Sequence, residues 1–198
     1  MRFHKLQDLG LKTILDIGAF KGDFSMEMRR LYPNAEIMMV EANPSCEKFL
    51  KLSGIPYEIC GLLDEIKTIP FYLEERDNIC SGASFLKEKT PYYAEGKVKT
   101  IQITTKTLDG QNYFGKKIDL IKLDCQGSEL QILKGAEKTL ENTKYLTIET
   151  SLVEYNENSP QIEEVFDFLS NKGFAAIEII DRLISDQTLQ IDFLFKKI

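Results

Sequence analysis

The sequence has a single histidine and no closely paired cysteines. His4 lies in the N-terminal segment, so no histidine elsewhere in the chain competes for the role of catalytic base. The cysteines show no C-x-x-C spacing, which disfavours both a disulfide scaffold and a zinc site. We expect small, half-buried thiols in a reducing compartment. The cysteines are Cys46, Cys60, Cys80 and Cys125.

Long apolar runs and an excess of basic residues are also missing. No window approaches the ~20 apolar residues of a membrane span, and the N-terminus does not read as a signal peptide. A cytoplasmic protein is therefore expected. The 25 Lys and Arg residues are outnumbered by 31 Asp and Glu residues, which gives a net charge of −6. This balance argues against nucleic acid as the main ligand, because phosphate binding needs a basic surface.

What the sequence does contain is a regular alternation of apolar runs and amphipathic segments. The apolar runs predict strands at residues 13–17, 37–40, 57–60, 66–73, 98–105, 118–124, 145–149, 174–180 and 191–195. Helical spacing is present at residues 22–31, from Asn43-Pro44 to about 50, at 130–140 with an interruption near Gly135, and at 161–171. This alternation is typical of an α/β domain with a mostly parallel sheet. The last two strands should pair antiparallel, because residues 181–190 are too few for a helical crossover. The length favours one domain over residues 1–198.

Ligands of open α/β sheets bind beyond the carboxyl ends of the strands. Five segments follow predicted strands in this way, and four of them begin with an acid. They are residues 16–22, 41–44, 60–63, 124–129 and 149–152. We therefore expect the functional residues in these segments.

The first of these segments is rich in glycine. A dinucleotide fingerprint G-x-G-x-x-G starting at Gly18 would need glycines where the chain has Phe20 and Asp23. A tight pyrophosphate turn is therefore disfavoured, whereas a nucleoside ligand or a purely structural turn remains open. Glu41, at the end of the second apolar run, can accept hydrogen bonds from both hydroxyls of a ribose, or it is a solvated acid.

The segment after the 118–124 strand holds candidate catalytic residues. Asp124 can act as a general base or orient a substrate hydroxyl, and Glu149, after the next strand, is the second candidate. Glu129 lies in a first helical turn, where an acid also gains from the helix dipole.

The central segment, residues 74–106, is long, irregular and locally basic. Lysines outnumber acids in it, at Lys87, Lys89, Lys97, Lys99 and Lys106 against Glu88 and Glu95. Such a segment is usually a functional loop or a disordered one. We expect an insertion that closes as a lid over an anionic or sugar acceptor, with Tyr92 and Tyr93 stacking on a sugar ring. An exposed, solvated loop is the alternative.

Three segments stand out when they are taken together. They are residues 16–25 (Asp-Ile-Gly-Ala-Phe-Lys-Gly-Asp-Phe-Ser), 40–44 (Val-Glu-Ala-Asn-Pro) and 119–135 (Asp-Leu-Ile-Lys-Leu-Asp-Cys-Gln-Gly-Ser-Glu-Leu-Gln-Ile-Leu-Lys-Gly). With residues 107–109 and 192–195, they resemble the FkbM family of S-adenosylmethionine-dependent methyltransferases, from about residue 13 to 197. The third segment is the specific one. Phe20 stands where the family often has Asn, and Gln126 where it often has Glu, which removes an acid.

The resemblance implies a Rossmann-like methyltransferase fold. Its seven-stranded sheet is mostly parallel with an antiparallel last strand, and helices cover both faces. It also implies O-methylation of a sugar, glycan or natural-product hydroxyl, with S-adenosylmethionine as cofactor. No metal ligand is assigned among the site residues. The cofactor-binding residues expected on this basis are Asp16, Gly18, Ala19, Phe20, Gly22, Glu41, Ala42, Cys60, Gly61 and Asp124. The acceptor-binding candidates are Tyr92, Tyr93, Ser84 and Gln126, and the catalytic candidates are Asp124 and Glu149.

Two alternatives stay open at the level of sequence. One is a nucleotide-dependent oxidoreductase, against which Phe20 and Asp23 argue. The other is a non-catalytic cofactor-binding module on a methyltransferase scaffold, because a fold does not by itself imply activity.

Overall fold

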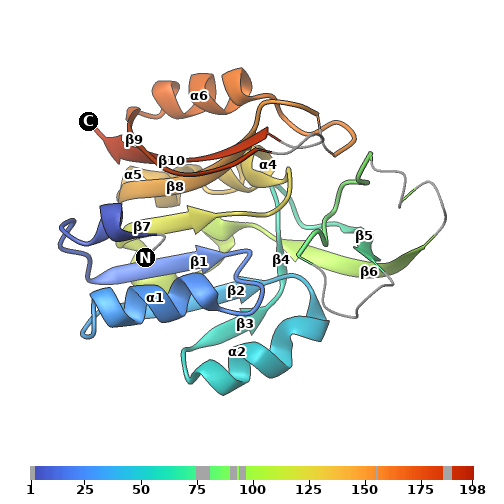
Figure 1. Cartoon of the computed structure of the whole chain (residues 1–198), viewed down its shortest axis with the longest axis horizontal. Helices are drawn as coiled ribbons and strands as arrows, with labels where there is room; N and C mark the ends of the chain where they lie inside the picture. Colours follow the sequence, from blue (N-terminus) through green and yellow to red (C-terminus); the bar gives the residue numbers. More distant parts are fainter. Residues whose placement is uncertain (1–2, 75–80, 90–92, 94–96, 155, 185–188) are drawn as a thin grey trace.

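A seven-stranded sheet forms the centre of the molecule (Figure 1). Its strands are β1 (Thr13–Ile17), β2 (Glu36–Glu41), β3 (Tyr57–Ile59), β7 (Ile118–Leu123), β8 (Thr143–Ser151), β9 (Phe174–Ile184) and β10 (Leu189–Lys197). They lie in the order β3-β2-β1-β7-β8-β10-β9. The pairs from β3 to β8 are parallel, and β10 is antiparallel to both of its neighbours. The predicted Rossmann-like sheet with an antiparallel last strand is confirmed. The computed structural model describes residues 3–74, 81–89, 93, 97–154, 156–184 and 189–198.

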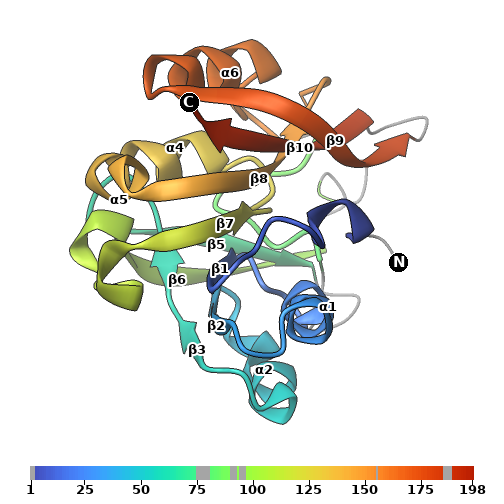
Figure 2. The same ribbon diagram turned by 90° about the vertical axis from the view of Figure 1, so that its left-hand side faces the viewer.

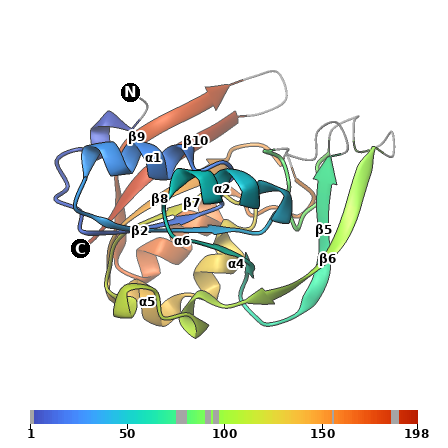
Figure 3. The same ribbon diagram turned by 90° about the horizontal axis from the view of Figure 1, so that it is seen from below.

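Helices cover both faces of this sheet (Figures 2 and 3). The α-helices are α1 (Asp23–Leu31), α2 (Glu47–Ser53), α4 (Glu129–Lys134), α5 (Glu137–Glu141) and α6 (Ile162–Asn171). Short 3-10 helices lie at η1 (His4–Leu6), η2 (Pro44–Cys46), η3 (Leu108–Gly110) and η4 (Tyr113–Lys116). Among the residues that the structure describes, no helix is both long and apolar enough to cross a membrane.

Two apolar cores hold the layers together, one on each face. Phe24 and Met28 of α1 and Leu50 of α2 pack on one face, together with η1. On the other face, α4, α5 and α6 bury Leu130, Leu133, Leu140, Val165 and Leu169. The helical spacing read from the sequence supplies these contacts, because residues three and four apart share one face of a helix.

A second, three-stranded sheet extends beyond the carboxyl ends of the central strands (Figures 1 and 3). It comprises β4 (Gly61–Leu62), β5 (Thr68–Glu74) and β6 (Val98–Lys106), in the order β4-β6-β5. β5 and β6 pair antiparallel, and β5 is the outer strand, in agreement with Pro70 in its sequence. Within the predicted insertion at 74–106, the structure therefore describes β6 and the segment 81–89, while the other parts lie largely outside the described residues.

The structure differs from the expected elements mainly in length. β9 and β10 extend past the predicted strands, with register shifts at two points, because they pair with each other through exposed polar residues such as Asp181 and Arg182. No apolar periodicity marks such residues as part of a strand. The helix after Asn43 begins as a 3-10 turn, in which the Asn43 side chain accepts a hydrogen bond from the Ser45 N–H.

Candidate functional site

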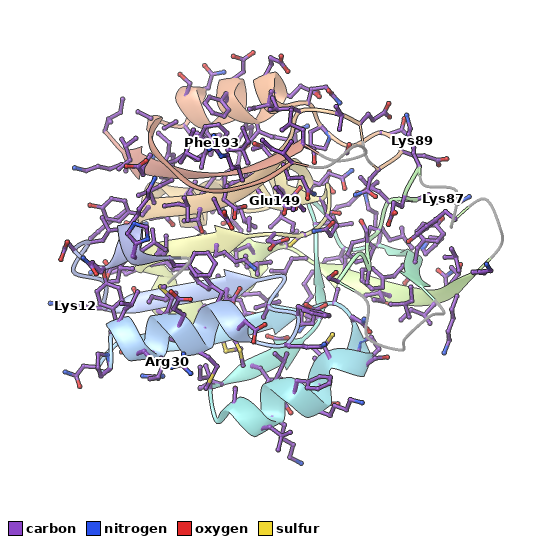
Figure 4. All side chains as sticks on the ribbon, viewed as in Figure 1. Lys12, Arg30, Lys87, Lys89, Glu149 and Phe193 are labelled. Carbon is purple, nitrogen blue, oxygen red and sulfur yellow. The ribbon has the colours of Figure 1, made fainter. Side chains whose placement is uncertain are left out.

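The carboxyl ends of β1, β2, β7 and β8 meet at one end of the central sheet, facing the β5–β6 hairpin (Figure 1). Glu149 marks this end in Figure 4, whereas Lys12 and Arg30 lie toward the opposite end. The strand-end segments singled out in the sequence are thus brought together by the sheet order.

The turn after β1 passes directly against the end of β7. Gly18 has a φ of 76°, and a Cβ atom built on it would lie 1.9 Å from the backbone oxygen of Asp124. Only glycine fits this approach. The N–H groups of Gly18 and Ala19 both donate to the Val40 carbonyl, at 2.9 and 3.1 Å, which fixes the turn on β2 as well. Gly22, also at positive φ, precedes α1.

Glu41 is buried beside this turn with both carboxylate oxygens engaged. Its Oε2 accepts a hydrogen bond from the Phe20 N–H and its Oε1 from the Asn43 N–H, each at 2.7 Å. Burial raises the pKa of Glu41, and the two N–H donors oppose that shift. A carboxylate offers about four acceptor positions, so each oxygen keeps a further one. Glu41 can thus bind two neighbouring hydroxyl groups at once.

Below the turn lies a buried ion cluster around Lys122. Its ammonium is 3.3 Å from Asp16 Oδ1 and 3.4 Å from Asp124 Oδ2, and it donates to the Gly18 carbonyl at 3.0 Å. Asp16 is fully buried and also accepts from the Ser25 hydroxyl at 2.7 Å. Burial alone would lower the pKa of Lys122, but the carboxylates of Asp124 and Asp16 hold it above its ordinary value. The cluster ties the turn to β1 and β7.

The two candidate catalytic acids are joined by a side-chain amide. Gln126 Nε2 donates to Asp124 Oδ1 and to Glu149 Oε2, at 3.1 Å each. A second amide, Gln190 Nε2 on β10, donates to the same Glu149 oxygen at 3.1 Å. Each N–H of the Gln126 amide therefore holds one carboxyl group, and both groups lie at the carboxyl ends of β7 and β8.

The electrostatics of this pair are asymmetric. Burial, and then the negative charge of Asp124, raises the pKa of Glu149 well above its ordinary value. Glu129 and Asp192 add to this shift, and Lys122 opposes it. Lys122 itself is closer to Asp124, with which it forms an ion pair. Of the two acids, Glu149 is the one whose protonated form is favoured by burial.

Gln126 occupies a strained turn that three other segments support. Its φ is 53°, which is uncommon for a residue with a side chain. Its carbonyl accepts from the Ser84 hydroxyl at 2.9 Å and from Asn156 Nδ2 at 2.6 Å. Glu129 Oε1 accepts from the N–H groups of Cys125 and of the residue after Gln126, at 2.6 and 3.3 Å. Burial raises the pKa of Glu129 to about 7.

The remaining predicted residues lie at the edges of this site. Cys60 and Gly61 follow β3, and Cys60 donates its N–H to the Glu41 carbonyl at 2.9 Å. Burial raises the pKa of Cys60 to about 12. The Phe85 ring packs over Gly61 so closely that a Cβ there would be 2.5 Å away. Ala42 is half-buried next to Glu41.

Of the acceptor-binding candidates, Ser84 and Gln126 contact each other, and Tyr93 lies at a cavity beside them in the fold. Ser84 is buried with its hydroxyl already bound to the Gln126 carbonyl. Tyr93 lines a cavity against β5 and β6, and Tyr92 lies outside the described residues. Within the described ranges, no group of three or more histidine, cysteine or acidic side chains is arranged to hold a metal ion.

Sequence reasoning missed three residues of the site. Lys122 carries a recognisable signal, a lone cation within a buried apolar strand. Asn156 and Gln190 carry none, because they lie far along the chain from the residues that they hold.

Comparison with known proteins identifies the family. Residues 16–176 match the methyltransferase FkbM domain. Methyltransferase sdnD from Sordaria araneosa is 32% identical, over 81% of this chain and 73% of that protein. Methyltransferase 1 from Beauveria bassiana (strain ARSEF 2860) is 24% identical, over 82% of this chain and 72% of that protein.

Solved structures share the fold at low sequence identity. The precorrin-6y C5,15-methyltransferase from Geobacter metallireducens GS-15 matches with a TM-score of 0.56 and 15% identity, over 100% of this chain and 87% of that one. The N-terminal domain of EvdMO1 with S-adenosylhomocysteine (SAH) bound matches with a TM-score of 0.56 and 12% identity, over 100% and 80%. The family match decides against the oxidoreductase alternative. The chain belongs to the FkbM family of methyltransferase domains.

Proposed function

We propose that this chain is an S-adenosylmethionine-dependent O-methyltransferase acting on a hydroxyl of a sugar, glycan or natural-product acceptor. The observation that carries the proposal is the carboxyl pair of Asp124 and Glu149, held together by Gln126 at the strand ends. A hydroxyl is a poor nucleophile, and a carboxylate within reach can accept its proton as the new bond forms.

The turn after β1 and the end of β2 fit the cofactor. Gly18 leaves the backbone open to close approach, and Glu41 keeps an acceptor position on each oxygen for the two ribose hydroxyls. Ala19, Phe20, Gly22 and Ala42 would line the same end, with Cys60 and Gly61 toward the adenine. Asp16 would support this end of the sheet through its contacts with Ser25 and Lys122. Magnesium protoporphyrin IX methyltransferase from Synechocystis, a fold relative with a TM-score of 0.54, has been solved with S-adenosylmethionine bound.

When bound, the cofactor would supply an activated methyl group, so the protein mainly has to position the acceptor and exclude water. We assign the proton acceptor to Asp124. Burial raises the pKa of Glu149 and so favours its protonated form, whereas Asp124 is paired with the Lys122 ammonium. Glu149 then serves as a hydrogen-bond donor that orients the acceptor.

A sugar acceptor has support from one fold relative. The N-terminal domain of EvdMO1, with a TM-score of 0.56 and 12% identity, was crystallised in the presence of SAH and D-fucose.

Isothermal titration of S-adenosylmethionine and SAH tests the cofactor assignment. Wild-type protein should bind both with micromolar affinity, and Glu41→Ala should weaken binding tenfold or more, about 1.4 kcal/mol. Glu36→Ala is the matched control, because Glu36 is exposed at the opposite end of the same strand. Absence of binding to the folded wild-type protein would contradict the proposal. Binding without transfer to any of a panel of hydroxylated acceptors would favour the non-catalytic module.

A further inference from the structure

A cavity of about 470 Å³ lies between the β5–β6 hairpin and the segment 81–89. Its volume falls within the range of small-molecule sites. The hairpin contributes Tyr72 and Thr100, the segment contributes Lys87 and Glu88, and Glu157 also lines the cavity. Neither the cofactor residues nor the carboxyl pair described above line this cavity.

The cavity offers one available cation. The Lys87 ammonium lies 5.6 Å from the centre of the Tyr72 ring and forms no ion pair with a described residue. Lys89, which also lines the cavity, is paired with Glu154. Lys87 is thus the group that can pair with an anionic ligand, and it lies beside an aromatic ring.

The cavity also contains a buried acid with an unmet hydrogen-bonding requirement. Glu88 is only 6% exposed, and among the described residues its Oε2 has no hydrogen-bond partner. Asn156, which pairs with Glu88 through the backbone, has an unpartnered Oδ1 in the same sense. Leaving a buried carboxylate oxygen unbonded is unfavourable. Because Glu88 lines the cavity, a ligand that donates a hydroxyl group to it would stabilise its carboxylate.

Hydrogen bonds connect this wall to the carboxyl pair. Asn156 donates through Nδ2 to the carbonyl of Gln126, whose side chain bridges Asp124 and Glu149. Ser84 pairs with Tyr72 through the backbone and donates to the same carbonyl. In Figure 4, Lys87 and Lys89 lie beyond Glu149, in the direction in which the central strands run.

We propose that this cavity is the acceptor subsite and that it takes an anionic sugar, whose carboxylate or phosphate group pairs with Lys87 and whose hydroxyls bind Glu88. The inference rests on the proposed function and narrows its acceptor class. A neutral sugar would leave Lys87 without a partner, and a simple anion would leave Glu88 without a donor.

Binding of defined sugars tests the assignment. D-glucuronate, D-glucose 6-phosphate and D-glucose are titrated into the full chain saturated with SAH. We expect at least one anionic sugar to bind tenfold or more tightly than glucose, and Lys87→Met to abolish that preference. Preference for glucuronate alone identifies a carboxylate ligand, and preference for the phosphate alone identifies a phosphorylated one. Lys99→Met is the control, because Lys99 is exposed on β6 and does not line the cavity.

A second variant guards against simple unfolding. Glu88→Gln should weaken the binding of all three sugars. An unchanged affinity for SAH would show that this variant is still folded. In methyl-transfer assays with the preferred sugar, Lys87→Met should raise KM tenfold or more and leave kcat within twofold.

An equal affinity of the wild type for glucose and both anionic sugars would overturn the inference, as would a preference that survives Lys87→Met or is lost equally in Lys99→Met. Failure of SAH to bind the wild type would instead be a failure of the proposed function.

Discussion

The two halves of the site hold their acids by different means. On β2, Glu41 is held by two backbone N–H donors. At the ends of β7 and β8, the carboxyl pair is held by the side-chain amides of Gln126 and Gln190. The Lys122 ammonium pairs with an acid of each half, Asp16 and Asp124. Backbone donors are present whatever the side chain, whereas an amide bridge depends on the identity of one residue. The first half can therefore bind a common cofactor, and the second half can vary with the acceptor.

The largest effect should come from Asp124→Asn. Removing the proton acceptor should lower kcat by about 10²- to 10⁴-fold, the usual contribution of a general base. SAH affinity should fall less than tenfold, since Glu41 and the turn at Gly18 are untouched. Glu41→Ala should show the reverse pattern, with a greater loss of binding than of kcat. Single-turnover transfer and SAH titration measure the two quantities.

The comparison would fail if Asp124→Asn retained kcat within tenfold of the wild type. It would also fail if the two variants lost binding and kcat in the same proportion, because the two halves would then act as one unit.

The next effect is the contribution of Glu129 to the pH dependence of the free energy of unfolding. Glu129 belongs to the second half of the site and accepts hydrogen bonds from backbone N–H groups. Its pKa is raised from 4.5 to about 7 in the folded protein. The folded state therefore binds the proton more tightly, and the free energy of unfolding should decrease as pH rises from about 4.5 to 7. The total decrease from this group is on the order of 3 kcal/mol.

Glu129→Gln should reduce this pH dependence, because the amide oxygen can still accept from the Cys125 N–H without a charge. Urea unfolding at several pH values measures it. The decline that remains is expected from Glu41 and Glu149, whose pKa values are also raised. Glu163→Gln, at an exposed position in the first turn of α6, should leave the wild-type slope unchanged. A full wild-type slope in Glu129→Gln would contradict the assignment.

The same difference explains what the sequence could predict. The mostly parallel sheet and the residues of the first half of the site were predicted from local signals: an apolar run, a glycine-rich turn after it, and an acid at the next strand end. Asp124 and Glu149 were predicted as strand-end acids. Their connection was not, because the Gln126 side chain that bridges them lies 23 positions before Glu149, and Gln190 lies 41 positions after it. No local pattern distinguishes these amides from exposed polar residues.

The smallest effect, and the sharpest test of the amide bridge, is Gln126→Glu. The substitution replaces a neutral donor with a carboxylate beside Asp124 and Glu149 and should raise the pKa of Glu149 further. Because a carboxyl group must be ionised to accept the hydroxyl proton, the added negative charge should move the acidic limb of the kcat profile to higher pH. We expect a shift of about one unit, equivalent to 1.36 kcal/mol.

Gln131→Glu provides the control for this shift, since it introduces the same charge on α4, whereas the amide that bridges Asp124 and Glu149 belongs to Gln126. Its pH profile should overlay that of the wild type. If the pH profile of Gln126→Glu also overlays that of the wild type, the amide does not control the ionisation of the carboxyl pair. The two halves of the site would then differ only in how far apart in the sequence their contacting residues lie. If only Gln126→Glu shifts, one side chain sets the pH range in which the proton acceptor is available.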